Sequence, residues 1–308
     1  MESKDQKSQK RDVYQIVTDR IIKELEKGTV PWRQPWANAG LPQNLITKRP
    51  YRGINVWLLA MLNYQHNFFL TEKQLKELGG SVLEGERPVP VVFWNWKEVK
   101  DDDSLEEKKV PFLRYYLVYN VQQCVGIAPN EIPELERPNN PIQRCEEIIE
   151  GMPKKPLVKF KEQKAYYNPL LDVVNMPKLK TFENSERYYE TFFHELVHST
   201  GHLSRLNRKE LMSMEEFGGD TYSVEELTAE MGSCYLKSHC GFDSTGFDQN
   251  VAYLQGWLSK LKGDRHFVIY AAGKAQHAVD FILNVQPEEK EVKVDDDVTN
   301  RDEKELVS

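Results

Sequence analysis

The sequence predicts an α+β protein with two domains, and three observations support this fold class. The chain has 308 residues and a mass of 36.0 kDa, enough for two domains of about 150 residues each. Segments with helical periodicity and short apolar segments typical of strands occur in both halves. Residues 128–141, rich in Pro, Asn and Glu, have the composition of a linker between a domain of residues 1–127 and a domain of residues 142–285.

The N-terminal half opens with residues 1–10, which after Met1 are all charged or polar and which we expect to be disordered. The first predicted helix follows, because apolar residues recur at helical spacing until Gly28 ends the pattern. The predicted elements of this half are helices at Val13 to Glu26, around Val56 to Tyr64, and at Thr71 to Leu78 with Thr71 as N-cap, then strands at Val89 to Trp96 and Phe112 to Val121.

The C-terminal half reads as helices around a few short strands. Its predicted helices are Ile142 to Glu150, a helix around His194, Val224 to Lys237, Asn250 to Leu261 and Ile269 to Ile282, and its apolar strand segments are Leu157 to Phe160, Ala165 to Tyr167 and Leu171 to Asn175. The segment Leu171-Asp172-Val173-Val174 has two interpretations. It is either a sheet edge that binds extended peptide or the strand that lies under the following helix.

Composition excludes several classes of protein. The N-terminus has no apolar region like that of a signal peptide, and no run of 18 apolar residues exists, so we expect a cytoplasmic protein without a membrane partner. The four cysteines lack C-x-x-C spacing and are predicted to be free thiols. The acidic segment 286–308 has almost no large apolar residues, and we expect it to be disordered.

Charge is distributed unevenly along the chain. Residues 1–127 contain 19 Lys and Arg against 16 Asp and Glu, a net charge near +3. Because the whole chain carries −7, the remainder is near −10. Only the N-terminal half is therefore expected to meet a polyanion.

The segment His194-Glu195-Leu196-Val197-His198 carries the clearest chemical signal. On a helix, residues i and i+4 lie on one face, so His194 and His198 can bring two imidazoles to one Zn²⁺ ion. Glu195 would act as general base for a water activated by the metal, as in zinc hydrolases. The competing interpretation is a helix with two core histidines and an exposed glutamate. The apolar neighbours and Gly201, well placed to end the helix, favour the metal site.

A third ligand is expected from the helix that starts at Val224. Glu226 followed at +4 by Glu230 has the form of a gluzincin ligand followed by an acid. Glu230 would then orient a histidine without itself binding the metal. Glu225 and His202 are alternative ligands. Ser223 and Glu226 also fit a capping box, in which Glu226 would only reach back to a backbone N–H.

Cations and flat rings alternate in two segments of the N-terminal half. Unpaired bases stack on such rings for about 1–3 kcal/mol each while cations track the phosphates, so these segments suit single-stranded DNA. The competing interpretation is that the rings are core residues and that Arg52 and Asn55 cap or brace loops. The predicted DNA-binding residues are Trp32, Arg33, Trp36, Lys48, Arg49, Tyr51, Arg52 and Asn55.

Several motifs together resemble ArdC-type antirestriction proteins. The matching segments are Pro31-Trp32-Arg33-Gln34-Pro35-Trp36, Tyr51-Arg52-Gly53-Ile54-Asn55, Val92-Phe93-Trp94, Tyr119-Asn120-Val121-Gln122-Gln123, His194 to His198 with Thr200-Gly201, and Glu225 to Glu230, which span about residues 11 to 285. The resemblance implies an N-terminal single-stranded-DNA-binding domain shared with plasmid conjugative primases, a C-terminal zincin-like metallopeptidase domain, and protection of incoming plasmid DNA from restriction. The acidic insertion Lys100 to Lys109 departs from a DNA-binding face and is expected to point away from DNA.

Two functions follow from these observations. In the first, the protein is a single-strand-binding antirestriction factor whose metal domain is a scaffold or acts on rare targets. In the second, it is a working zinc endopeptidase that the N-terminal domain carries to DNA-bound proteins. A purely structural zinc module is disfavoured by Glu195, because structural sites close with four protein ligands and need no base.

Overall fold

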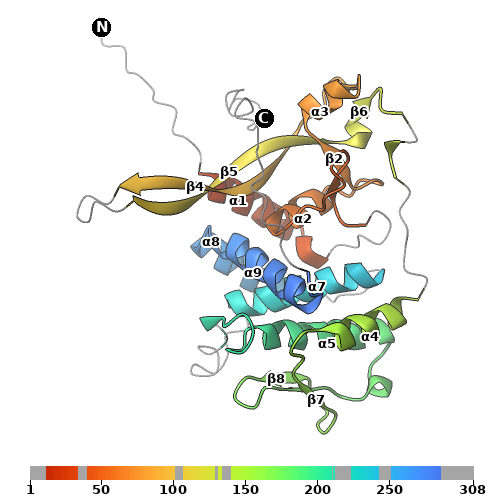
Figure 1. The fold of residues 1–308 in the computed structure, drawn as a ribbon, viewed down its shortest axis with the longest axis vertical. Helices are drawn as coiled ribbons and strands as arrows, with labels where there is room; N and C mark the ends of the chain where they lie inside the picture. Colours follow the sequence, from red (N-terminus) through yellow and green to blue (C-terminus); the bar gives the residue numbers. More distant parts are fainter. Residues whose placement is uncertain are drawn as a thin grey trace.

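A computed structural model describes residues 12–33, 40–100, 107–128, 131–133, 140–209, 211, 223–242 and 251–285 of the chain. The N-terminal half contains a long β-ribbon packed with helices, and the C-terminal half contains several helices and a small sheet (Figure 1). The predicted α+β class is confirmed. Residues 1–11, 34–39, 101–106 and 286–308 lie outside the described residues. The predictions that fall on them are DNA binding by Trp36, the direction of the acidic insertion, and disorder at the two ends of the chain.

The N-terminal half is built on a four-stranded sheet of order β1-β2-β5-β4. Two of its helices begin at side-chain caps: Asp12 accepts a hydrogen bond from the Tyr14 N–H, and Thr71 forms a capping box with Gln74. The elements are α1 (Val13–Glu26), β1 (Gln43–Asn44), α2 (Ile54–Ala60), β2 (Phe68–Leu70), α3 (Glu72–Glu77), β3 (Ser81–Val82), β4 (Val89–Lys100), β5 (Glu107–Asn120) and β6 (Cys124–Val125).

The β4–β5 ribbon is longer than predicted. Its antiparallel ladder runs from Val89 opposite Val118 to Lys100 opposite Glu107, and so includes charged residues beyond the predicted ends of the two strands. Main-chain hydrogen bonds do not depend on side-chain polarity, so the ladder continues where apolar alternation stops. The insertion therefore lengthens the ribbon, which extends away from the helices (Figure 1).

The C-terminal half packs helices over a three-stranded sheet of order β7-β9-β8. Its central strand β9 is fully buried, so the segment around Val173 is the strand under the helix, and its interpretation as a sheet edge is wrong. The edges are β7 and β8. The elements are α4 (Pro141–Gly151), β7 (Leu157–Lys159), β8 (Tyr166–Asn168), β9 (Val173–Asn175), α5 (Ser185–Thr200), α7 (Val224–Cys240), α8 (Val251–Gly263) and α9 (Phe267–Ile282).

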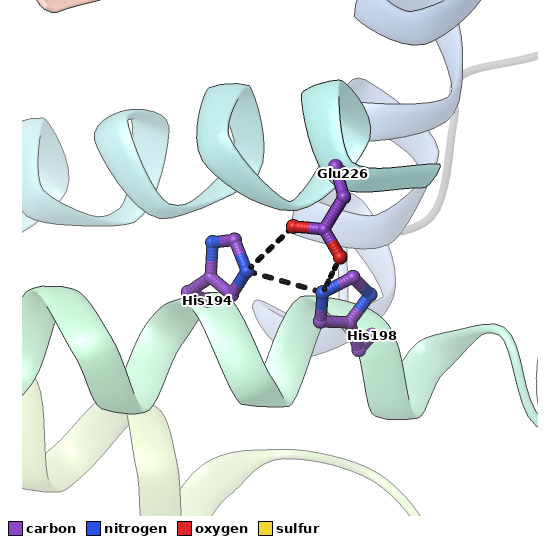
Figure 2. Close-up of side chains that lie close together, drawn as sticks. All are labelled: His194, His198 and Glu226. Atoms are coloured by element: carbon purple, nitrogen blue, oxygen red, sulfur yellow. Dashed lines mark hydrogen bonds and ion pairs between the residues drawn. The ribbon is translucent and has the colours of Figure 1, made fainter. Parts of the chain in front are cut away.

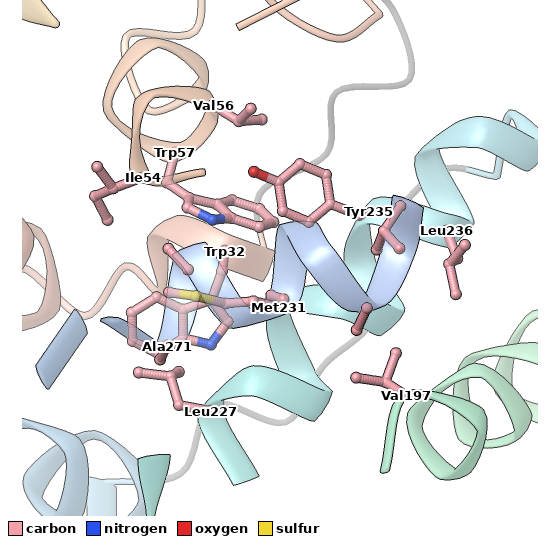
Figure 3. Packing of buried hydrophobic residues seen from close by; sticks show 14 of the residues in the cluster. Trp32, Ile54, Val56, Trp57, Val197, Leu227, Met231, Tyr235, Leu236 and Ala271 are labelled. Carbon is pink, nitrogen blue, oxygen red and sulfur yellow. The ribbon is translucent and has the colours of Figure 1, made fainter. Parts of the chain in front are cut away.

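One hydrophobic cluster continues from the N-terminal half into the C-terminal half. Figure 3 shows Trp32 and Trp57 of the first half beside Met231 and Tyr235 of α7. The Trp57 and Tyr235 rings meet edge to face at 4.8 Å, and the Tyr235 hydroxyl donates to the Gly53 carbonyl at 2.7 Å. The two domains therefore share a packed interface that includes the helix predicted to hold the third metal ligand.

Two further expectations concern cysteines and membranes. All four cysteines are free thiols, as predicted. Among the described residues, none of the helices combines the length and apolar character needed to cross a bilayer.

Candidate metal centre

Helix α5 presents the two histidines because its ends are well defined. The Asn184 side chain caps its start by accepting from the Arg187 N–H at 2.9 Å, and Gly201 is the C-cap, as predicted. Phe193, Leu196 and Val197 are fully buried in the core. This packing directs the face that carries His194 and His198 toward α7.

Helix α7 lies against α5 through small and polar residues. Gly232 leaves no room for a side chain, since a Cβ atom there would lie 2.7 Å from Cγ2 of Val197. The Ser233 hydroxyl donates to the Glu190 carbonyl at 2.7 Å, and the Lys237 ammonium donates to the Glu190 carboxylate at 3.2 Å. These contacts set the rotation of α7 about its axis, and hence which of its glutamates faces the histidines.

His194, His198 and Glu226 converge on one point (Figure 2). The two Nε2 atoms are 3.1 Å apart, and each lies 3.4 Å from an oxygen of Glu226. Two ligand atoms at about 2.0–2.1 Å from a tetrahedral Zn²⁺ are roughly 3.3 Å apart. The three donors therefore already have the spacing that a tetrahedral divalent ion requires, and the set leaves a fourth position open.

The second ring nitrogen of His198 is held by Glu225, which precedes Glu226 in the sequence. His198 Nδ1 lies 3.1 Å from Oε1 of Glu225, and Arg208 donates to both oxygens of that carboxylate. The prediction that Glu230 orients a histidine is wrong. Glu230 instead accepts from the Trp32 indole N–H at 3.1 Å and from the Tyr253 hydroxyl.

Hydrogen bonds and charges within this cluster shift the pKa values of His198, Glu225 and Glu226. Burial by itself would lower the pKa of His198, but the hydrogen bonds and negative charges of Glu226 and Glu225 raise it to about 10. Burial would raise the pKa of Glu225, yet Arg208 and His198 lower it to about 2. The pKa of Glu226 is likewise held well below its usual range by the two histidines, despite burial. A bound cation would take the place of the proton between these groups.

The alternative third ligands do not reach this point. His202 lies beyond the end of α5, and its Nδ1 is 2.8 Å from the Ser204 hydroxyl. Ser223 does cap α7, because its hydroxyl accepts from the Glu226 N–H at 3.1 Å. The cap uses the backbone of Glu226 and leaves its carboxylate at the histidines. Glu195 is 9% exposed and directly follows His194 on α5.

Several predicted DNA-binding residues are not available to a base. The prediction for Trp32 is wrong, because its ring is fully buried against Trp257 at 6.0 Å and 90°. The short turn η1 (Pro31–Arg33) directs the ring inward, where a loop rich in proline and aromatics had suggested an exposed platform. Tyr51 is only 8% exposed and packs edge to face on Phe69, so its prediction is wrong for the same reason.

The polar residues of the second segment brace the fold. Both ends of the Asn55 amide bind the backbone of Val92, at 2.6 and 2.7 Å, which is the loop-bracing alternative. Arg52 forms an ion pair with Asp280 of α9 and keeps 46% of its side chain exposed. Lys48 and Arg49 are exposed, as a DNA contact requires, whereas the side chain of Arg33 lies outside the described residues.

Sequence reasoning missed Arg208 altogether. This residue follows the metal-binding helix in an irregular segment, where no periodicity marks its side chain as buried. The one available signal for a buried partner was the pair Thr200-Gly201, which belongs to the family pattern. The end of a helix accounts for the glycine of this pair but not for the threonine. The Thr200 hydroxyl accepts a hydrogen bond from the Arg208 guanidinium, and Gly201 leaves room for that group.

Comparison with known proteins agrees with this architecture. Residues 11–119 match the N-terminal domain of anti-restriction factor ArdC, and residues 144–274 match a zincin-like metallopeptidase domain. The metal-free crystal structure of antirestriction protein ArdC from plasmid R388 shares 37% identity and a TM-score of 0.72, over 90% of this chain and 100% of that one. The chain belongs to the ArdC antirestriction family. The Mn(II)-bound structure of R388 ArdC gives 34% identity and a TM-score of 0.70, over 91% of this chain and 100% of that one.

Two further relatives extend the ArdC comparison. DNA primase TraC of Escherichia coli is 32% identical over 296 residues, which cover 89% of this chain but only 20% of TraC. The uncharacterized protein y4eC of Sinorhizobium fredii is 30% identical over 286 residues, covering 88% of this chain and 91% of y4eC. This chain therefore spans about a fifth of the length of the primase, and matches y4eC and ArdC over nearly their whole lengths.

Proposed function

We propose that this ArdC-family protein binds single-stranded DNA through its N-terminal domain and holds a divalent metal ion in its C-terminal domain. The ion we propose is Zn²⁺. Its role is to protect incoming plasmid or mobile-element DNA from restriction. The family supports the antirestriction role. The observation that carries the metal site is the convergence of His194, His198 and Glu226 within 4.8 Å of one another.

The donor set favours zinc among the divalent ions. Two imidazoles and one carboxylate with near-tetrahedral spacing suit Zn²⁺, and R388 ArdC has been crystallised with Mn(II). When bound, the ion would supply a Lewis acid and lower the pKa of a water at the open position. The protein's own residues would hold His198 in one ring orientation through Glu225, and Glu195, which follows His194 on α5, would be the proton acceptor.

A second candidate function is a zinc endopeptidase recruited to DNA-bound proteins. It is favoured by the open ligand position together with Glu195, since a scaffold would need neither. In this function Glu195 accepts the proton of the attacking water and passes it to the leaving amine. The two candidates differ in one respect that can be measured: only the peptidase needs the base.

Metal content of purified protein tests the site. We expect His194→Ala and His198→Ala to lose bound zinc, and Glu195→Gln to keep it, because a general base contributes to chemistry and hardly to affinity. His202→Ala, which changes a histidine outside the cluster, is the matched control and should bind zinc like the wild type. Full zinc occupancy in either ligand variant would overturn the assignment.

Protection assays with Glu195→Gln separate the two functions. Restriction-sensitive plasmid DNA is introduced into restricting cells that express wild type or variant, and the surviving fraction is counted. If the metal domain is a scaffold, Glu195→Gln protects as well as the wild type. If protection is lost while zinc and single-strand binding are retained, the protein acts as a peptidase. A wild type that gives no protection would refute the antirestriction role.

A further inference from the structure

Arg208 is buried at the point where the two metal-binding helices meet. Main-chain hydrogen bonds fold the chain back after α5, with the Leu206 N–H donating to the Thr200 carbonyl and the Arg208 N–H to the Gly201 carbonyl, both at 2.9 Å. The Arg208 side chain is thereby placed between the last turn of α5 and the first turn of α7. Only 6% of it is exposed.

The guanidinium binds both helices at once. Toward α7, Nε and Nη2 donate to the two oxygens of Glu225, at 2.8 and 2.5 Å. Toward α5, Nη1 donates to the Thr200 hydroxyl at 2.5 Å and Nη2 to the Val197 carbonyl at 2.8 Å. Such a planar fork holds a carboxylate in one orientation, which the compact ammonium of lysine cannot do.

The same carboxylate holds the ring of His198. Oε1 of Glu225 lies 3.1 Å from His198 Nδ1, while Nε2 on the other side of the ring faces His194 and Glu226. An unbroken chain of contacts therefore runs from Arg208 through Glu225 to the metal-facing nitrogen. A change in the orientation of the fork would be transmitted to the ring.

The residues that end α5 are suited to receive this arginine. A Cβ atom on Gly201 would lie 3.1 Å from Nη2 of Arg208 and 3.0 Å from Leu211, so a larger residue would crowd the guanidinium. Gly201 has φ −70°, an ordinary helical value, so space and not backbone conformation explains the glycine. Thr200 supplies the hydroxyl that accepts from Nη1. The pair Thr200-Gly201 thus forms part of the metal centre's support.

We propose that Arg208 is a positioning residue of the metal centre, which fixes Glu225 and through it the ring of His198. This inference rests on the proposed metal site. It assigns Arg208 a specific role in metal affinity, beyond tying the segment after α5 to the core.

Arg205 provides a matched control in the same segment. Its Nη2 also contacts both oxygens of a carboxylate, Asp172, at 2.7 and 2.9 Å, and its Nε donates to the Lys154 carbonyl at 2.9 Å. None of these contacts involves a predicted metal ligand. Arg205→Lys therefore removes a guanidinium–carboxylate contact from the same loop without touching the chain of contacts that leads to His198.

The experiment measures affinity for Zn²⁺ by competition with a chromophoric chelator, on the full chain at one pH. We expect Arg208→Lys to bind about 10- to 100-fold more weakly, the usual effect of losing an outer hydrogen-bond partner of a metal ligand. Arg205→Lys should bind like the wild type. The visible absorption spectrum of bound Co²⁺ should change in Arg208→Lys and stay unchanged in Arg205→Lys, because it reports ligand geometry. Circular dichroism checks that each variant is folded.

A double-mutant cycle excludes a general effect on folding. If Arg208 acts through Glu225, adding Arg208→Lys to Glu225→Gln should weaken zinc binding much less than it does in the wild type. Wild-type affinity in folded Arg208→Lys would overturn the proposal. Should that variant not fold, Glu225→Gln alone decides, and wild-type affinity there overturns it equally. A wild type that binds no zinc would instead refute the metal site itself.

Discussion

Replacing Gly232 with alanine is expected to force α7 away from α5 and to weaken metal binding. The new Cβ atom would lie 2.7 Å from Cγ2 and 3.0 Å from Cγ1 of Val197. Carbon atoms in contact are about 3.5–4.0 Å apart, so the helices must separate by about 1 Å or Val197 must leave its rotamer. Val197 is fully buried and directly precedes His198, so either response disturbs the ligands.

The loss of stability in Gly232→Ala can be estimated by comparison with the same substitution at a second helical glycine. Overpacking a core costs about 1–3 kcal/mol, whereas alanine in place of glycine within a helix gains up to about 1 kcal/mol. Gly273 lies within α9, and a Cβ atom there meets nothing within 4 Å. Both substitutions gain the higher helix propensity of alanine, but only Gly232→Ala overpacks the core. Gly232→Ala should therefore be less stable than Gly273→Ala by about 1–3 kcal/mol.

The assay is urea unfolding of both variants in the presence of a chelator, followed by zinc affinity on the folded proteins. We expect Gly273→Ala to match or exceed the wild type in stability and to bind zinc normally. The penalty of Gly232→Ala should shrink in a Val197→Ala background, since the two sites are in contact. Equal stability and equal zinc affinity in the two alanine variants would refute the packing argument.

Three further predictions concern pH and DNA. In metal-free protein, the pKa of His198 is raised from 6.5 to about 10. Protonated His198 therefore stabilises the folded state fully below pH 6.5, and this stabilisation is lost as the pH rises toward 10. The free energy of unfolding of the metal-free protein should therefore fall between pH 6.5 and about pH 10, and a flat profile would contradict the pairing of His198 with Glu225 and Glu226. Trp32→Phe, which loses the hydrogen bond to Glu230, should cost about 1 kcal/mol in urea unfolding and leave single-strand affinity unchanged; a loss of affinity in the folded variant would restore Trp32 as a base platform. Combined Lys48→Ala and Arg49→Ala should weaken single-strand binding and reduce the slope of log affinity against log salt by about 0.7 per lost phosphate contact, with stability within about 0.5 kcal/mol; an unchanged slope would place the phosphate contacts elsewhere.

Local regularity explains what could be predicted at the metal site. The i, i+4 spacing of His194 and His198 is set by the hydrogen bonds of a single helix, so their common face follows from sequence alone. The same holds for the N-cap Thr71, whose effect acts within a few residues. The α+β class and the limits of α1 are likewise properties of local pattern.

The errors concern residues whose role depends on distant partners. Trp32 lies in a loop without periodicity, and its burial comes from α7 and α8, more than 190 residues away in sequence. Glu225 and Glu230 differ from Glu226 by rotation about one helix axis, which sequence does not orient relative to α5. No local pattern distinguishes a glutamate that braces His198 from one that binds Trp32.

Sequence alone therefore determined the chemical groups available in this protein: two histidines on one helix and a set of candidate carboxylates on the same helix and the next. The tertiary structure decided which carboxylate binds where, because the contact of Gly232 with Val197 sets the rotation of α7. It also decided that Arg208 supports the site, since a guanidinium can fix Glu225 only when the chain folds back beneath α5. Ligand type is a property of single residues, whereas ligand orientation is a property of helices packed against each other.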